Sequence, residues 1–222
     1  MMIRRSNFLF LVELTNFSNF KLLNYQKKEK PSFFMQQTPP EVRRAFGLLF
    51  IGVSISVGVA SVLSEIAFVN KFQTLYYGMI WFGSFGITFG IIFGKFRNIL
   101  PSIRGRMKNS VKWSKNVKAV NGLCWAAPFA AIGIFPNLYQ YLILLGIGLG
   151  NLSTYFFMRK FSGLDNREQI IVAVISLVAI PVAIAIDTSQ LITNQTIAVI
   201  TSRILIAIAY GAGGIYALLA KK

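Results

Sequence analysis

Histidine is absent from this 222-residue chain, and cysteine occurs once, at Cys124. The missing histidine excludes histidine-ligated haem, HExxH zinc sites and histidine-based catalytic triads. A single cysteine excludes an intramolecular disulfide, and we interpret Cys124 as a packing residue. Charge is also scarce, because charged residues make up 14% of the chain, against about 25% in ordinary soluble domains.

Hydrophobic residues make up 55% of the chain and fall in long blocks with few charges, which is typical of a polytopic membrane protein. Six apolar segments are predicted, at 45–69, 75–94, 119–135, 138–158, 169–186 and 196–219. A helix needs about 20 residues to cross the hydrocarbon, so segment 119–135 is marginal, and Pro128 is expected to bend it. We therefore expect an all-α integral membrane protein, a bundle of six transmembrane helices.

Acidic residues are few, seven against 23 lysines and arginines, and the cations predict the orientation through the positive-inside rule. If all six segments cross, only Lys71 falls on the outer side and only Arg203 lies within a segment. Five crossings would instead place Arg159, Lys160 and Arg167 outside. We therefore predict a multi-pass protein of the plasma membrane with both termini in the cytoplasm (N-in/C-in).

The net charge of +16 is explained largely by this orientation. The basic cytoplasmic loop 95–118 carries Lys108, Lys112 and Lys115 at helical spacing, between apolar residues. This pattern predicts a short amphipathic helix that contacts anionic lipid headgroups. The loop lacks the aromatic stacking pattern of single-strand nucleic-acid binders, so the bilayer is the predicted partner and nucleic acid is not.

The first 44 residues are expected to form a cytoplasmic tail, and residues 45–222 the transmembrane domain. Residues 1–34 are rich in Asn, Phe, Lys and Ser, and no small-residue cleavage site follows their short apolar run. Two interpretations stay open: a flexible tail with weak interfacial helix character, or sequence upstream of a true start at Met35. Neither interpretation assigns a function to the segment.

Arg203 is the only charged residue between Thr196 and Ala220. A charge at the centre of a membrane helix costs about 2.5–3.5 kcal/mol on insertion scales, so a partner is expected. Glu65 is the one other charged residue well inside a predicted segment, at a similar depth. We predict an intramembrane ion pair between Glu65 and Arg203, with a structural or a substrate-handling role. Asp187 is expected either to join this pair or to be solvated at a helix end.

Small residues form stripes at helical spacing on two segments, 45–69 and 196–219, and we predict that these two segments pack together. A third stripe, of GxxxGxxxG type, lies on segment 75–94 and indicates a helix contact within the chain or between protomers. The predicted packing residues are Gly58, Ser61, Ala207, Gly211 and Gly214 for the first contact, and Gly86, Gly90 and Gly94 for the second.

The segments offer little for catalysis, because Glu65 is their only carboxylate well inside the bilayer and no lysine base accompanies a serine. We therefore predict no enzymatic activity, no cofactor and no metal site. The preferred hypothesis is a non-enzymatic accessory subunit or oligomeric membrane scaffold, with other membrane subunits or a second copy as partner. The alternative is a small-molecule or ion permease that uses Glu65 and Arg203. A water-accessible cavity at these residues would favour the permease, and a dry interface the scaffold.

Overall fold

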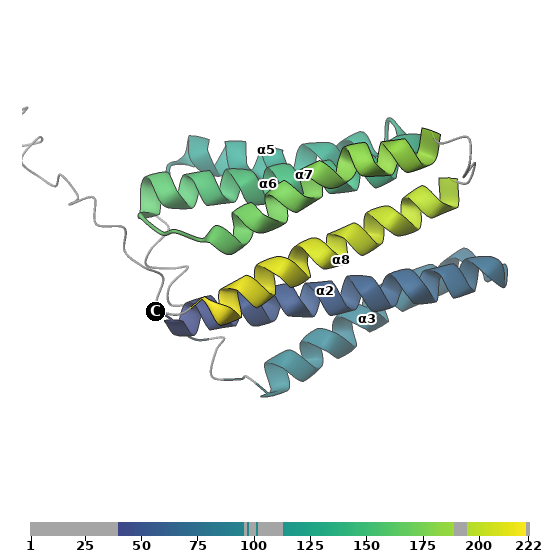
Figure 1. Ribbon diagram of the computed structural model, residues 1–222, viewed down its shortest axis with the longest axis horizontal. Coiled ribbons are helices and arrows are strands. Elements are labelled where there is room, and N and C mark those ends of the chain that lie inside the picture. The colour runs from purple at the N-terminus through teal and green to yellow at the C-terminus, as the bar shows by residue number, and fades with distance from the viewer. Residues whose placement is uncertain (1–39, 96, 98–100, 102–112, 189–194, 221–222) are drawn as a thin grey trace, which may run out of the picture. The chain divides into compact units, whose positions relative to one another are not determined.

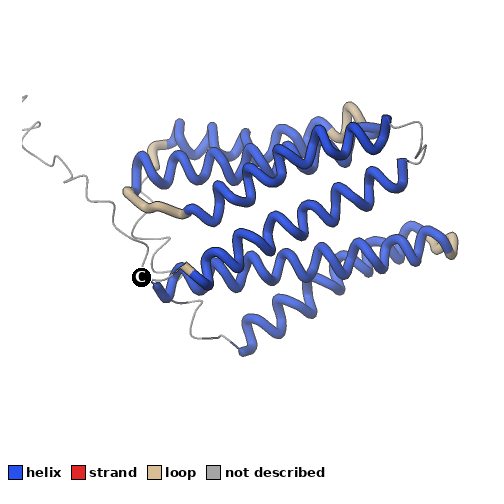
Figure 2. The backbone as a smooth tube through the Cα atoms, in the orientation of Figure 1, coloured by secondary structure: helices blue, strands red, loops and turns tan. Residues whose placement is uncertain are grey.

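The computed structural model describes residues 40–95, 97, 101, 113–188 and 195–220 (Figure 1). These ranges are helical apart from short connections and contain no strand (Figure 2). The helices are α2 (Pro40–Val69), α3 (Thr74–Lys95), α5 (Lys115–Ala131), α6 (Tyr139–Ser162), α7 (Arg167–Thr188) and α8 (Gln195–Leu219). A 3₁₀ turn, η1 (Pro136–Leu138), comes directly before α6. The predicted all-α architecture is confirmed for these residues.

Each predicted segment overlaps one helix, and α3, α7 and α8 begin and end within two residues of the prediction. The helix α2 begins at Pro40, so the last residues of the predicted tail are helical; proline suits a first turn because its missing N–H has no helical partner there. The remaining part of the tail, including Met35, lies outside the described residues. So do Lys108 and Lys112 of the predicted amphipathic helix.

The helix α5 lies four residues earlier than predicted, because Ser114 caps its N-terminus. The Ser114 hydroxyl accepts a hydrogen bond from the backbone N–H of Val117 at 3.4 Å. The helix α6 continues to Ser162, past its predicted end. Gly163 follows it with a φ of 63°, the left-handed conformation that commonly ends helices.

Five helical stretches are long and apolar enough to cross a membrane: Arg43–Val69, Thr74–Gly94, Pro136–Ser162, Arg167–Thr188 and Ile197–Leu219. The helix α5 is not among them. Its 17 residues stand at the lower end of the range of about 17–25 that spans a bilayer. Six crossings therefore stay a prediction, with α5 as the marginal helix, as expected from the sequence.

The helices follow one another in space in the order α3, α2, α8, α7, α6, α5, so that α8 lies between α2 and α7 (Figure 1). Neighbouring helices are antiparallel. On α6, Gly148 faces Leu177 of α7, while Gly146 and Gly150 on the opposite side face Phe129 and Trp125 of α5. This alternation explains the GIGLG sequence of α6, which has a tightly packed neighbour on each side.

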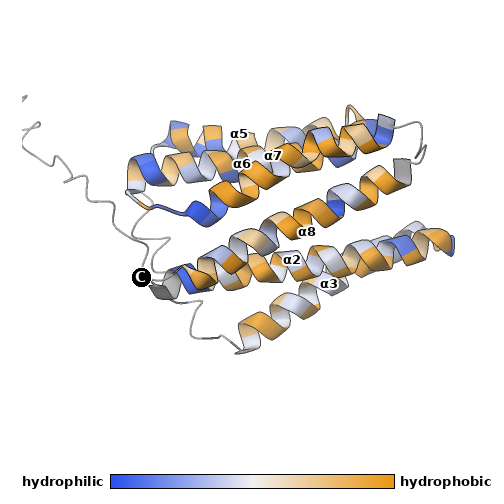
Figure 3. Ribbon diagram, in the orientation of Figure 1, coloured by the Kyte–Doolittle hydropathy of each residue, from blue (hydrophilic) through white to orange (hydrophobic). Residues whose placement is uncertain are grey.

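Several small polar residues are buried in this bundle, and many large apolar residues are exposed. Ser56, Ser61 and Ser202 are at most 2% exposed, and each hydroxyl donates to the carbonyl four residues earlier in its helix. Phe82 is 85% exposed and Leu75 72% exposed, and apolar residues cover much of the helix surface (Figure 3). An apolar surface of this extent suits contact with lipid.

The predicted contact between the small-residue stripes of α2 and α8 is present. A methyl group on Gly214 would lie 2.9 Å from the Gly47 carbonyl oxygen, and a methyl on Gly58 would lie 3.9 Å from the Ala207 methyl. Between these points the Ser54 hydroxyl donates to the Ala207 carbonyl at 2.6 Å, beside Gly211. Small residues allow this approach, which is the means by which helices associate in lipid.

Gly214→Ala is expected to lower the free energy of unfolding in detergent by about 1–3 kcal/mol, because the new methyl group overpacks the contact with α2. Gly122→Ala on α5 is the matched control, since no atom lies within 4 Å of the added methyl. It is expected to leave stability equal or higher, by up to about 1 kcal/mol from helix propensity. Equal stabilities for the two variants would contradict the close α2–α8 contact.

Candidate functional site

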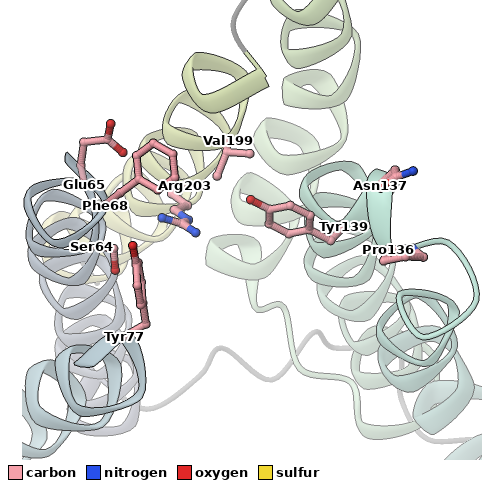
Figure 4. Close-up of a pocket in the computed structure, with 9 residues that line it drawn as sticks. All are labelled: Ser64, Glu65, Phe68, Tyr77, Pro136, Asn137, Tyr139, Val199 and Arg203. Carbon is pink, nitrogen blue, oxygen red and sulfur yellow. The ribbon is translucent and has the colours of Figure 1, made fainter. Parts of the chain in front are cut away.

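A pocket of about 380 Å³ opens at the end of the bundle where α2 ends and α8 begins (Figure 4). Four helices, α2, α3, α6 and α8, and the 3₁₀ turn η1 contribute to its wall. Its lining residues are Ser64, Glu65 and Phe68 of α2, Tyr77 of α3, Pro136 and Asn137 of η1, Tyr139 of α6, and Val199 and Arg203 of α8. The pocket therefore brings both residues of the predicted ion pair to one place, together with several groups that the sequence did not assign to it.

The guanidinium of Arg203 is held by aromatic residues. Its central carbon lies 5.7 Å from the centroid of the Trp81 ring, a cation–π contact that stabilises the charge away from bulk water. The hydroxyl groups of Tyr77 and Tyr139 point toward the guanidinium from opposite sides (Figure 4). Tyr139 interacts electrostatically with Arg203. These contacts leave the positive charge without a neutralising anion.

Glu65 does not form the direct ion pair that the sequence predicted. The two side chains do not approach within 4.0 Å, and the one ion pair among the described residues joins Arg167 to Asp165 at 2.8 Å. In Figure 4 the Glu65 carboxylate points away from the guanidinium, and the Phe68 ring lies between them.

Helix register explains this separation. The antiparallel contact between Gly58 and Ala207 places Arg203 opposite Ser61 one turn further along α2. Glu65 then faces Val199, one turn beyond Arg203. The sequence predicted a gap in depth of a few ångströms that the long Arg203 side chain would span, but the guanidinium contacts Trp81 instead.

Ser64 contributes a buried hydroxyl to the pocket. The residue is 1% exposed, and its Oγ has no hydrogen-bond partner within the described part of the chain. Burying a hydroxyl without a hydrogen-bond partner costs free energy.

The other predicted site residues lie elsewhere. The α2–α8 contact contains five of them, and none of the five lines the pocket: Gly58, Ser61, Ala207, Gly211 and Gly214. In α3, no atom lies within 4 Å of a methyl added at Gly86, Gly90 or Gly94, so their stripe faces away from every described helix.

Two charged residues named in the sequence analysis, Lys115 and Asp187, lie outside the pocket. Lys115 is the first residue of α5. Asp187 accepts a hydrogen bond from the Tyr141 hydroxyl at 2.5 Å and does not line the pocket, so it joins α7 to α6.

The sequence positions of the pocket's aromatic residues suggest a role at the membrane interface and not in a pocket. Tyr77, Trp81 and Tyr139 lie near predicted segment ends, where aromatic residues are typical of the membrane interface. Their relation to Arg203 depends on three helices meeting, which no pattern within one segment reports. Within the described ranges no group of three histidine, cysteine or acidic side chains is arranged to hold a metal ion.

No protein-family model, curated protein or solved structure matches this chain.

The cation–π contact predicts a coupling free energy of about 0.5–2 kcal/mol between Trp81 and Arg203. It is measured with Trp81→Leu, Arg203→Met and the double variant, from unfolding in detergent. The control cycle exchanges the charges of Glu65 and Arg203. Because these groups do not touch, Glu65→Arg with Arg203→Glu is expected to be no more stable than the two single changes predict. Recovery of stability by the exchange would show a direct ion pair instead.

Proposed function

We propose that this protein is a permease of the plasma membrane, and that its pocket binds a small solute bearing a carboxylate group. The observation that carries the proposal is a cavity of about 380 Å³ that reaches Arg203 and Glu65. Ligand pockets commonly measure about 300–1,000 Å³, with a mainly apolar wall and a few placed polar groups. An ionisable residue inside a membrane protein is by default a candidate for the transport path.

The proposed topology has six crossings with both ends of the bundle domain in the cytoplasm. Its support is the distribution of cations on the antiparallel helices. The described cations at one end of the bundle are Arg43 and Arg44 of α2, Lys95 at the end of α3 with Arg97 just after it, Lys115 and Lys118 of α5, Arg159 and Lys160 of α6, and Arg167 of α7. Lys71 lies at the other end, in the α2–α3 connection. The cationic end is assigned to the cytoplasm by the positive-inside rule, and the pocket then opens outward.

Arg203 is the proposed anchor for the solute's carboxylate. A guanidinium binds a carboxylate with two parallel hydrogen bonds, and the Tyr77 and Tyr139 hydroxyls are placed to add further donors. The apolar wall of Phe68, Pro136 and Val199 suits an aliphatic chain. Small branched carboxylic acids are therefore the solutes that match the pocket best.

The pocket is closed toward the cytoplasmic end. Deeper in the bundle, Val57 of α2, Ile206 of α8 and Leu144 of α6 are at most 6% exposed and belong to one apolar cluster. A bound solute can pass only if this layer separates, as in transporters that alternate between outward-facing and inward-facing states. Next to Tyr139, the amide nitrogen and oxygen of Gln140 are both buried without a hydrogen-bond partner among the described residues. Such a group favours the passage of a polar solute near this layer.

Transport is tested by uptake of radiolabelled leucine and of radiolabelled 4-methylpentanoate into liposomes that contain the purified protein. Leucine and 4-methylpentanoate share the carboxylate and the branched chain. We expect uptake of at least one of them above empty liposomes, and its loss in Val199→Phe, where a ring fills the pocket. Val174→Phe is the matched control, because Val174 is 50% exposed on the outer face of α7. Uptake of neither solute, or equal uptake by both variants, would reject the permease.

A second candidate function, an oligomeric scaffold, is favoured by α3. Only 6% of its most apolar stretch is buried, and its glycine stripe faces no described helix. In lipid, an open glycine stripe suits close packing against a second copy of the chain.

The scaffold predicts that the protein is a dimer in mild detergent by light scattering. Gly90→Leu is then expected to give monomers, because a bulky side chain prevents close approach of the two stripes. Gly122→Leu on α5, which is equally open, should remain dimeric. A monomeric wild-type protein would remove this candidate.

A further inference from the structure

The pocket contains one fixed positive charge and one fixed negative charge that do not neutralise each other. Arg203 is half-buried with rings and hydroxyl groups as neighbours, and Glu65 is half-buried beyond the Phe68 ring. Because Arg203 and Glu65 do not pair with each other, each can attract a group of opposite charge on a ligand.

The charge pattern selects among solutes that carry different groups. A simple cation is repelled by Arg203, and a dianion is repelled by Glu65. A monocarboxylate satisfies the guanidinium and leaves Glu65 without a partner in a partly desolvated site. A solute with one carboxylate and one ammonium group satisfies both residues, and its net charge of zero has the lowest cost of entering a membrane protein.

The position of Arg203 sets which end of the solute lies where. A carboxylate binds the guanidinium, beside the Trp81 ring and the Tyr139 hydroxyl. The ammonium group then lies on the side of Glu65, the other charged residue of the pocket wall.

We propose that the pocket binds a zwitterionic amino acid, with its carboxylate on Arg203 and its ammonium group on Glu65. This inference rests on the permease proposed above and names its substrate class. The aliphatic and aromatic walls, Val199 and Phe68, favour an apolar side chain over a charged one, since a third charge in the pocket would have no counter-ion.

The test uses three probes that differ in one group each: leucine, 4-methylpentanoate, which lacks the amine, and 3-methylbutylamine, which lacks the carboxylate. Binding to the full chain in lipid nanodiscs is measured by calorimetry. We expect leucine to bind at least roughly tenfold more tightly than 4-methylpentanoate, because a charge-assisted hydrogen bond is lost with the amine. The amine alone should bind weakest, because it meets Arg203 without a carboxylate.

Glu65→Gln sharpens the assignment. It is expected to weaken leucine binding roughly tenfold and to leave 4-methylpentanoate binding equal or stronger, because it removes the repulsive carboxylate. Arg203→Lys should weaken both acids, since lysine lacks the two-pronged geometry. The wild-type ratio of leucine to 4-methylpentanoate affinity is informative even if a variant fails to fold.

Two negative outcomes are distinguishable. Equal binding of leucine and 4-methylpentanoate to the wild-type protein would overturn the amino-acid assignment and leave the carboxylate permease standing. Binding of neither acid would overturn both proposals.

Discussion

The close contact between α2 and α8 sets the depth of every functional group in this protein. Gly214 meets the backbone of Gly47 so closely that no side chain fits between them, and the Ser54–Ala207 hydrogen bond joins the same two helices further along. Two helices in such contact cannot slide by a turn without placing a side chain against a backbone. The register that results places Arg203 and Glu65 one turn apart at the rim of one pocket, where both are accessible and neither neutralises the other.

Arg203 shows how a charge can remain in an apolar helix without a carboxylate beside it. The Trp81 ring offers its electron-rich face, and hydroxyl groups from two other helices surround the guanidinium. Such neighbours reduce the cost of burying the charge while leaving its hydrogen-bond donors oriented into a cavity. A salt bridge would have made the same residue structural. Its environment here is the one that the proposed binding role requires.

Much of the fold was predictable from hydropathy. Long apolar blocks gave α3, α7 and α8 to within two residues, because the limits of these helices coincide with the limits of their apolar stretches. The helix α5 was displaced because its start depends on the Ser114 cap, a local hydrogen bond that hydropathy does not register. The α2–α8 contact was predictable because small residues at helical spacing have one main use in lipid. The lack of a direct ion pair between Glu65 and Arg203 was not, because it depends on how other helices bring Trp81 and Tyr139 to the guanidinium.

The positions of the three tryptophans have a spectroscopic consequence. Trp81 lies against Arg203, whereas Trp113 and Trp125 donate hydrogen bonds to Ser162 and Thr154 at the α5–α6 interface, away from the pocket. Indole emission depends on nearby charge and on access of water. A chain in which phenylalanine replaces Trp113 and Trp125 would therefore carry one native fluorophore beside the cavity, and its emission would follow occupancy of the site without any attached dye.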